Sequence, residues 1–425
     1  MRRLAIASVF ALAGCASQSN LHLAPCRIAD APARCGTFDV PESPQSSRRL
    51  ALKVIVLPAT ERNESAIFPF VGGPGVPATP GAGLEVTEFA AERRLHDAVF
   101  VDERGSGGSA PLVCPSAMKT HDHELIEQDL FPTAFVADCR REIEAYADPS
   151  QYTFDRFVDD VDTLRQALGY GPINIVAMSA GTRAALTLLA RHPQSVRTML
   201  LTGPVPPQNR IPLNFAADSQ PVLDSILGNH RDLDAALALL PVDIQSGEYT
   251  IHMTRGAFME YLRTRLYTAE SRSSVPTIVK SAASGDWQSI APDFIKYRRN
   301  FYDGVGVFLS ITCPTDVRYI RDEEATDYRV ARQVAACKQW TPGLAPRVSV
   351  TTTSVPVLIF SGGLDPVTPM RWATMLAHDL GHARVIGFSN DGHTESGPCA
   401  DKIEVEFFDA GSFGKINDYC ASITP

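Results

Sequence analysis

The feature that most constrains the fold is a strand, a tight turn, a helix and a second strand in residues 173–201. Residues 173–178 form a short apolar run, residues 182–192 have helical spacing, and residues 198–201 are apolar again. Pro193 ends the helix because proline lacks the amide hydrogen that a helix interior needs. A strand that leads through a helix to another strand is typical of a parallel sheet, so we expect an α/β fold.

The same alternation of short apolar runs and amphipathic segments occurs on both sides of this unit. Further strands are expected at 52–57, 98–101, 355–360 and 384–388. Helices are expected at 154–168, where Thr153 is a suitable N-cap, and at 370–380. The predicted architecture is a mostly parallel central sheet with flanking helices.

The character of the chain changes after Gly203, where four prolines mark a break and the following residues are richer in helical spacing and charge. We interpret this stretch as an inserted, mainly helical cap. The expected organisation is a signal peptide (1–14), an N-terminal anchor or linker (15–44), the first part of the core (45–203), the cap (204–347) and the C-terminal part of the core (348–425).

Composition excludes some classes of function. Of the 425 residues 44% are hydrophobic and 20% charged, with a net charge of -9 and no block of lysines and arginines. A nucleic acid is therefore not an expected partner. No interior apolar run is long enough to predict a membrane-spanning helix.

The N-terminus predicts export. Arg2 and Arg3 precede a short apolar stretch, which ends in the sequence Leu-Ala-Gly-Cys at Cys15. This ending resembles the bacterial lipoprotein box, so we expect Cys15 to carry lipid, the protein to lie on a membrane, and the anchor to hold it at the periplasmic side of the outer membrane. An ordinary secretory signal is the alternative interpretation.

The cysteine count also fits an exported protein. Nine cysteines leave eight when Cys15 is set aside, and an even number outside the reducing cytoplasm predicts disulfides. Proximity in the sequence suggests four pairs: Cys26 with Cys35, Cys114 with Cys139, Cys313 with Cys337, and Cys399 with Cys420. Zinc is disfavoured because the sequence contains no CxxC pair and no histidines at ligand spacing.

Ser179 is the candidate nucleophile. It lies in Ala177-Met178-Ser179-Ala180-Gly181, between an apolar strand and a helix, where a sharp turn would expose its hydroxyl. The helix N-terminus behind it offers backbone amides, including that of Ala180, to a developing negative charge. The alternative is a serine that only caps the helix.

A glycine-rich loop upstream is a candidate oxyanion hole. Residues 72–75 read Gly-Gly-Pro-Gly and follow an apolar run, and glycines allow backbone amides to approach a ligand closely. We expect the amide of Gly73 to act together with that of Ala180. A plain Gly-Pro turn is the alternative.

A serine hydroxyl needs a base, and the base needs an acid to orient it. Asp365 follows the expected strand at 355–360, and His393 follows the next strand. The order Ser, Asp, His predicts a catalytic triad of Ser179, Asp365 and His393. Asp391 is the rival for the acid, but it lies so close to His393 in the chain that the geometry would be strained.

With these residues in place, the chain resembles the exported tripeptidyl-aminopeptidase and proline-iminopeptidase branch of the α/β-hydrolases, over roughly Cys35 to Cys420. Residues 72–75 match the family's Gly-Gly-Pro-Gly loop, and residues 102–109 are similar to its Asp-x-Arg-Gly-x-Gly-x-Ser segment. The resemblance implies an α/β-hydrolase fold with a helical cap, and structural rather than catalytic roles for Asp102 and Arg104.

The resemblance also implies a serine peptidase that releases residues from a peptide's free N-terminus, with no cofactor. Relatives hold the substrate's ammonium with acidic cap residues, and Asp316 is a weak candidate for that role here. The family usually has Gly-x-Ser-Tyr-Gly around its nucleophile, where this chain has alanine at 177 and 180. An esterase of small esters and a non-catalytic binding lipoprotein are therefore the alternatives. The sequence makes no prediction about the oligomeric state.

Overall fold

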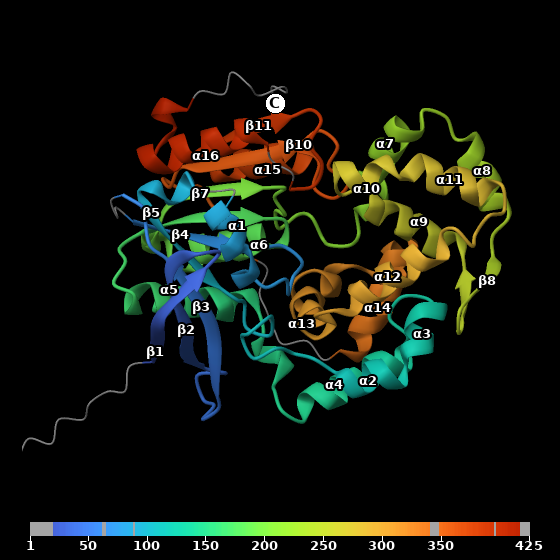
Figure 1. Cartoon of the computed structure of the whole chain (residues 1–425), viewed down its shortest axis with the longest axis horizontal. Helices are drawn as coiled ribbons and strands as arrows, with labels where there is room; N and C mark the ends of the chain where they lie inside the picture. Colours follow the sequence, from blue (N-terminus) through green and yellow to red (C-terminus); the bar gives the residue numbers. More distant parts are fainter. Residues whose placement is uncertain (1–19, 62–64, 88–89, 341–347, 395–396, 417–425) are drawn as a thin grey trace, which may run out of the picture.

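The computed structural model describes residues 20–61, 65–87, 90–340, 348–394 and 397–416. It contains a nine-stranded sheet in the order β1-β2-β3-β5-β4-β6-β7-β10-β11, which lies in the left half of Figure 1. The strands are β1 (Leu21–Ile28), β2 (Ala31–Pro41), β3 (Arg49–Leu57), β4 (Ser65–Phe70), β5 (His96–Val101), β6 (Ile173–Met178), β7 (Val196–Thr202), β10 (Val357–Gly362) and β11 (Ala383–Phe388). Strands β1, β2, β3 and β5 pair antiparallel, and all pairs from β5 to β11 are parallel. The expected α/β fold with a mostly parallel sheet is confirmed.

Both faces of the sheet are covered by helices. In β10, Val357 and Ile359 belong to one apolar cluster, whereas Leu358 and Phe360 belong to another on the opposite face. Successive side chains of a strand point to opposite faces, so a strand that is apolar throughout must be covered twice. The first cluster includes helices α5 (Phe154–Ala167), α6 (Ala180–Arg191) and α15 (Met370–Leu380), and the second includes α16 (Pro398–Ala410). Helix α1 (Ala82–Thr87) contributes Ala82 to a smaller cluster with β3 and β5.

Local signals in the sequence explain where the core helices begin and end. The side chain of Thr153 accepts a hydrogen bond from the amide of Arg156, which caps α5. Gly381 follows α15 with φ +69°, a left-handed conformation that favours glycine. Both features agree with the helices expected at 154–168 and 370–380.

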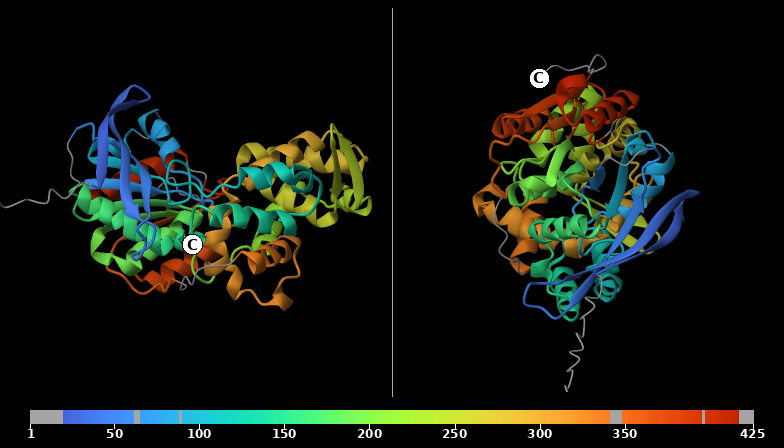
Figure 2. Two further views of the ribbon diagram at one scale, coloured as in Figure 1. Left: turned by 90° about the horizontal axis from the view of Figure 1, so that it is seen from below. Right: turned by 90° about the vertical axis from the view of Figure 1, so that its left-hand side faces the viewer.

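The segment between β7 and β10 forms a cap with its own apolar core. It contains helices α7 (Phe215–Leu227), α8 (Arg231–Ala238), α9 (Arg255–Arg265), α10 (Ala269–Ser273), α11 (Val275–Ala283), α12 (Ala291–Tyr302), α13 (Val305–Thr315) and α14 (Tyr328–Gln339), and a hairpin of β8 (Val242–Ser246) and β9 (Tyr249–Met253). Figure 2 shows this part of the chain extending to one side of the sheet, with the β8–β9 hairpin at the far end. None of the described helices is long and apolar enough to cross a membrane.

Three helices from outside the expected insertion join the cap: α2 (Pro115–Thr120), α3 (Asp122–Glu127) and α4 (Thr133–Glu144). Ile126 of α3 lies in the apolar core of the cap, and the Arg298 guanidinium of α12 donates to the carbonyl oxygen of Leu125 at 2.8 Å. The assignment of the cap to residues 204–347 alone was therefore too narrow. The three helices lie beside α12 and α14 in Figure 1.

The expected anchor or linker at 15–44 is a second correction. Strands β1 and β2 occupy most of its described part and form one edge of the main sheet. Phe38 and Val40 are buried in the core. The core therefore begins near Leu21 and not at residue 45.

Three of the four expected disulfides are present: Cys26–Cys35, Cys114–Cys139 and Cys313–Cys337. They join β1 to β2, the start of α2 to α4, and α13 to α14. Cys420 of the fourth expected pair lies outside the described residues, as do Cys15 and the expected signal peptide.

Candidate active site

Ser179 lies in the tight turn between β6 and α6. Its backbone has φ +51° and ψ -127°, a conformation that non-glycine residues seldom adopt. A Cβ on Gly181 would lie 2.3 Å from the carbonyl oxygen of Phe70, so a side chain does not fit at this position. The strained turn places the serine on the wall of a cavity at the carboxyl end of β6.

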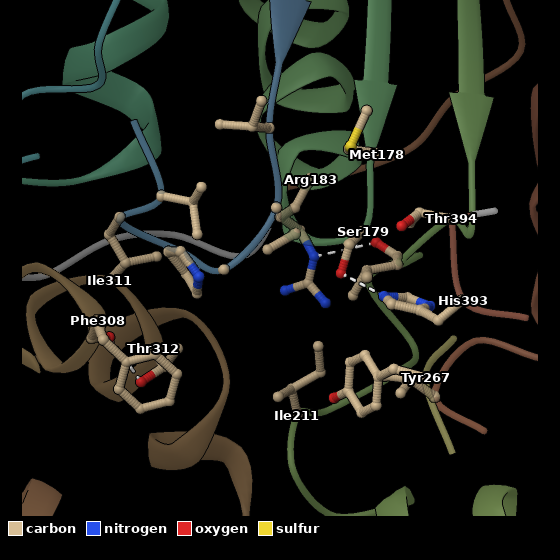
Figure 3. Close-up of a pocket in the computed structure, with 18 of the residues that line it drawn as sticks. Met178, Ser179, Arg183, Ile211, Tyr267, Phe308, Ile311, Thr312, His393 and Thr394 are labelled. Carbon is tan, nitrogen blue, oxygen red and sulfur yellow. Dashed lines mark hydrogen bonds between the residues drawn. The ribbon is translucent and has the colours of Figure 1, made fainter. Parts of the chain in front are cut away.

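The structure brings the three candidate catalytic residues together. Ser179 Oγ lies 2.8 Å from His393 Nε2, and His393 Nδ1 lies 2.9 Å from Asp365 Oδ2 (Figure 3). His393 is 6% exposed and Asp365 1% exposed, so water screens these contacts little. The carboxylate in contact with His393 Nδ1 is that of Asp365. Asp391, the other candidate for the acid, is not needed to explain this contact.

Asp365 is held by its own loop. Its Oδ1 accepts hydrogen bonds from the amides of Val367 and Thr368 at 2.8 and 2.7 Å, and its Oδ2 accepts one from Thr368 Oγ1 at 2.7 Å. Burial by itself raises the pKa of this carboxyl group. The charge of His393 and the hydrogen bonds from His393 and Thr368 outweigh burial and hold the pKa of Asp365 below its ordinary value. Asp365 is therefore ionised beside the imidazole.

Thr368 and Gly203 are functional candidates that sequence reasoning missed. A Cβ on Gly203, the residue after β7, would lie 2.9 Å from Thr368 Oγ1 and 3.3 Å from Asp365 Oδ2. A side chain at this position would therefore displace Asp365 or Thr368. Thr368 has a local signal, because a carboxylate that bonds the amides two and three residues later is a common turn pattern. Gly203 has no such signal.

The cap holds the loop that carries the base. The backbone amide of His393 donates to the carbonyl oxygen of Tyr267, just after α9, at 2.8 Å. The ring of Tyr267 meets the imidazole edge to face, with 5.1 Å between ring centres. Sequence reasoning missed Tyr267 because its contact with His393 spans the boundary between cap and core.

The glycine loop lies directly against the nucleophile. A Cβ on Gly72 would come within 2.9 Å of Ser179 Cβ, and Gly73 has φ +121°. Gly72, Gly73 and Ala180 all line the cavity that contains Ser179. Gly73 and Ala180, the expected oxyanion donors, thus both lie beside Ser179. Gly72 must also be glycine, because a side chain there would collide with Ser179.

Buried hydrogen bonds hold the segment at 102–109 in place. Asp102 accepts hydrogen bonds from the amides of Thr79 and Gly108 at 2.7 and 2.9 Å, and Arg104 donates to both oxygens of Asp160 at 2.8 Å. These are the structural roles expected for Asp102 and Arg104.

Glu103, between them, reaches the glycine loop itself. It accepts a hydrogen bond from the backbone of Gly75, and burial raises the pKa of its carboxyl group to about 8. The hydrogen bond from Gly75 and the charge of Arg104 offset only part of that increase. Oε1 has no hydrogen-bond partner. Glu103 is therefore a protonated acid at neutral pH, and sequence reasoning had assigned it no role.

The cavity in front of Ser179 has a volume of about 490 Å³. Figure 3 shows Phe308 and Ile311 of α13 on the opposite side of the cavity from Ser179, with Ile211 and Tyr267 below Ser179 in this view. Core and cap thus enclose the cavity together. Its walls are largely apolar, with buried arginines as the main exception.

Asp316 does not present a free carboxylate to this cavity. Its Oδ1 accepts a hydrogen bond from Arg183 Nη1 at 2.9 Å, and its Oδ2 accepts one from Thr315. Arg183 also donates to the carbonyl oxygens of Val205, Pro206 and Asn209. A buried arginine therefore already pairs with Asp316, and the role of Asp316 in holding a substrate ammonium stays a prediction.

Within the described part of the chain, no group of three or more His, Cys, Asp or Glu side chains could hold a metal ion.

A family model of the alpha/beta hydrolase fold matches residues 90–395. The chain belongs to the alpha/beta hydrolase fold family. Ser179, Asp365 and His393 all lie within the match, as does the cap. The order of the strands and the tight turn at Ser179 also agree with this fold.

Individual relatives of this α/β-hydrolase are distant. It is 26% identical over 189 residues to the "Putative hydrolase YuaR" of Escherichia coli (strain K12), and the aligned part is 40% of this chain. The chain spans about a third of the length of YuaR, since 36% of that protein is covered.

Solved structures of low identity are also similar. A thermophilic esterase from Thermogutta terrifontis has 13% identity and a TM-score of 0.41, with 84% of this chain and 91% of that chain covered. A serine hydrolase from Cycloclasticus zankles has 15% identity and a TM-score of 0.40, with 88% and 98% covered.

Proposed function

We propose that the protein is a serine hydrolase that works through an acyl-enzyme. The observation that carries this proposal is the continuous contact from Ser179 Oγ through His393 to Asp365. His393 takes the serine proton as Oγ attacks a substrate carbonyl, and Asp365 stabilises the imidazolium that forms. The imidazolium then gives the proton to the leaving group, and water repeats the sequence to release the acid.

The backbone amides of Gly73 and Ala180 hold the oxyanion in this proposal. Both residues line the cavity beside Ser179, and the strained turn orients the start of α6 toward it. Loss of one such donor typically costs about 3 to 4 kcal/mol of transition-state stabilisation.

For the substrate we propose a carboxylic ester with a short acyl group. The cavity walls are largely apolar. The buried carboxylate that lines the cavity, Asp316, is paired with Arg183 at 2.9 Å. Glu260 lies behind the lining residue Arg263 and pairs with it at 2.7 Å. An apolar acyl group can be buried in such a cavity, whereas an ammonium ion would find no unpaired carboxylate among the described residues of its interior.

A second candidate is the release of residues from the free N-terminus of a peptide, the activity of the family that the motifs resemble. Asp303 favours it, because this exposed carboxylate after α12 lines the same cavity and forms no ion pair with another residue that the structure describes. An ammonium group at the mouth of the cavity would find its counter-charge there.

Paired chromogenic substrates test these two classes. We expect Ser179→Ala to abolish turnover of 4-nitrophenyl esters of short acids and of aminoacyl 4-nitroanilides alike. If the esters are the better substrates, the ester proposal holds. If the nitroanilides are better, and Asp303→Asn lowers kcat/KM on them more than on the esters, the aminopeptidase is the right reading.

We also propose that the protein is exported and carries lipid on Cys15. The three disulfides support this proposal because stable disulfides form outside the reducing cytoplasm. Mass spectrometry of the mature N-terminus tests it: a diacylglyceryl group on Cys15 that Cys15→Ser removes is the expected result, and an unmodified N-terminus elsewhere would exclude the anchor.

A further inference from the structure

The geometry points to Arg329 as a binding site for a carboxylate on the acyl part of the substrate. We infer that this enzyme prefers acyl groups that end in an anion. The inference rests on the proposed serine hydrolase function and gives that same site a substrate class.

Three buried arginines line the cavity that contains Ser179: Arg183, Arg263 and Arg329. Two of these guanidinium groups already have protein partners for their N–H donors. Arg183 pairs with Asp316 and donates to three backbone carbonyls. Arg263 donates to both oxygens of Glu260, at 2.7 Å each, and to the hydroxyl of Tyr267 at 3.0 Å.

Arg329 is different. It is 4% exposed, and its Nε donates to Gln333 Oε1 at 3.2 Å, but its Nη1 is buried without a hydrogen-bond partner. The nearest carboxylate oxygen to Nη1 is Glu260 Oε1, at 3.5 Å. Because Arg263 already holds both oxygens of Glu260, that carboxylate is shared between two guanidinium groups.

The cluster therefore carries an excess positive charge. Arg263 and Arg329 contribute two buried cations, and Glu260 contributes one anion. Their charges hold the pKa of Glu260 below its ordinary value, although burial alone raises it. Glu260 therefore compensates Arg329 only in part, and a buried cation that is only partly paired can accept a further anion.

Aromatic rings hold the Arg329 guanidinium at the wall of the cavity. Its central carbon lies 4.6 Å from the ring centre of Phe301 and 5.6 Å from that of Phe308. Both phenylalanines line the cavity themselves, and Figure 3 shows Phe308 across the cavity from Ser179. An acyl chain whose carbonyl lies at Ser179 therefore extends toward the Arg329 side.

A carboxylate is the anion that fits best. The guanidinium is a planar fork of N–H donors that matches the two oxygens of a carboxylate. The apolar walls between Ser179 and the Phe301–Phe308 pair suit a short methylene chain. The substrate class is thus a monoester of a dicarboxylic acid, cleaved at the ester end.

Substrate pairs test the inference in the wild-type protein. We would compare mono-4-nitrophenyl esters of glutarate, adipate and pimelate with 4-nitrophenyl esters of monocarboxylic acids of the same chain length. We expect kcat/KM to favour the anionic ester by about tenfold or more for at least one chain length. Equal rates, or faster turnover of the neutral partner at every length, would overturn the inference.

Variants test whether Arg329 causes the preference for anionic esters. Arg329→Gln should lower the ratio of anionic to neutral kcat/KM by about tenfold or more, and Arg329→Lys should lower it less. Arg332→Gln is the matched control, because Arg332 lies on the same helix and pairs with Asp129 at the surface. If Arg332→Gln changes the ratio as much as Arg329→Gln does, Arg329 is not the site.

A binding measurement separates this inference from the proposed chemistry. Calorimetric titration with adipamate, the monoamide of adipic acid, and with the neutral hexanamide needs no reactive serine. Adipamate should bind the wild type at least tenfold more tightly than hexanamide, and Arg329→Gln should remove that difference. If Ser179 proves unreactive but adipamate binds in this way, only the hydrolase proposal fails. If Ser179 reacts but the two amides bind equally, only the anion site fails.

Discussion

The backbone amide of His393, on the catalytic loop of the core, donates a hydrogen bond to the carbonyl oxygen of Tyr267 in the cap, at 2.8 Å. The same tyrosine contacts the imidazole with its ring and accepts a hydrogen bond from Arg263 through its hydroxyl. The cap therefore does more than cover the cavity, because one of its residues fixes the loop that carries the proposed base.

Removing the Tyr267 ring should slow the reaction of Ser179. An edge-to-face aromatic contact contributes about 0.5 to 1.5 kcal/mol, so we expect Tyr267→Ala to lower the rate of labelling by a fluorophosphonate roughly twofold to tenfold. Tyr267→Phe keeps the ring and should retain most of the rate. Equal losses in the two variants would show that the hydroxyl and not the ring matters.

Thr368 should set the acid sensitivity of the site. The hydrogen bond from its hydroxyl helps to hold the pKa of Asp365 below its ordinary value. A carboxyl group with a lowered folded pKa stabilises the protein above its unfolded pKa, and the protein loses that stabilisation as pH falls through the folded pKa. Thr368→Val raises the folded pKa, so acid unfolding should begin at a higher pH than in the wild type. Urea unfolding between pH 3 and 7 measures this, and identical profiles would contradict it.

The same substitution should lower kcat. A hydrogen bond to a charged group contributes about 1.5 to 3 kcal/mol, which corresponds to a loss of about tenfold to a hundredfold if Asp365 is less well oriented. Thr368→Ser keeps the hydroxyl and serves as the control.

Glu103 should make the protein less stable as the medium becomes alkaline. Its pKa is raised from 4.5 to about 8, so the folded protein binds its proton more tightly than the unfolded chain does. That contribution to stability is complete below the unfolded pKa and is lost as pH rises toward about 8. Glu103→Gln cannot lose a proton. We expect its stability relative to the wild type to increase by roughly 4 kcal/mol between pH 5 and pH 9. A constant difference across this range would show that Glu103 does not titrate.

The Arg183–Asp316 pair should behave as a structural unit. Removal of one partner leaves a buried charge without compensation, which costs about 3 to 5 kcal/mol. We expect Asp316→Ala to lower the free energy of unfolding by about that amount. If Asp316→Ala leaves unfolding unchanged and raises only the KM for substrates with an ammonium group, Asp316 binds substrate after all.

Much of the core could be predicted from the sequence because its signals are local. The strands at 173–178 and 198–201 are buried on both faces and therefore read as continuous apolar runs. Thr153 and Gly381 mark helix ends through contacts within a few residues. The order of Ser179, Asp365 and His393 along the chain, each after an expected strand, indicated a triad before any distance was known.

The parts that were missed depend on contacts between distant segments. Strand β1 is only partly buried and contains Pro25 and Arg27, so its pattern resembles a linker. The ion pair of Asp316 could not be predicted, because its partner, Arg183, lies 133 residues away in the sequence. No pattern in the sequence joins Arg329 to the residues that surround it, because α14 meets α9 and α13 only after the cap has folded.

The proposed function depends most directly on whether Ser179 is an activated nucleophile. The measurement is labelling of the folded, oxidised protein with a fluorophosphonate, followed by mass spectrometry to locate the adduct, in the wild type and in Ser179→Ala and His393→Ala. We predict an adduct on Ser179 in the wild type, none in Ser179→Ala, and labelling at least a hundredfold slower in His393→Ala. Folded wild-type protein that gains no adduct, or gains one on another residue, would contradict the proposed function.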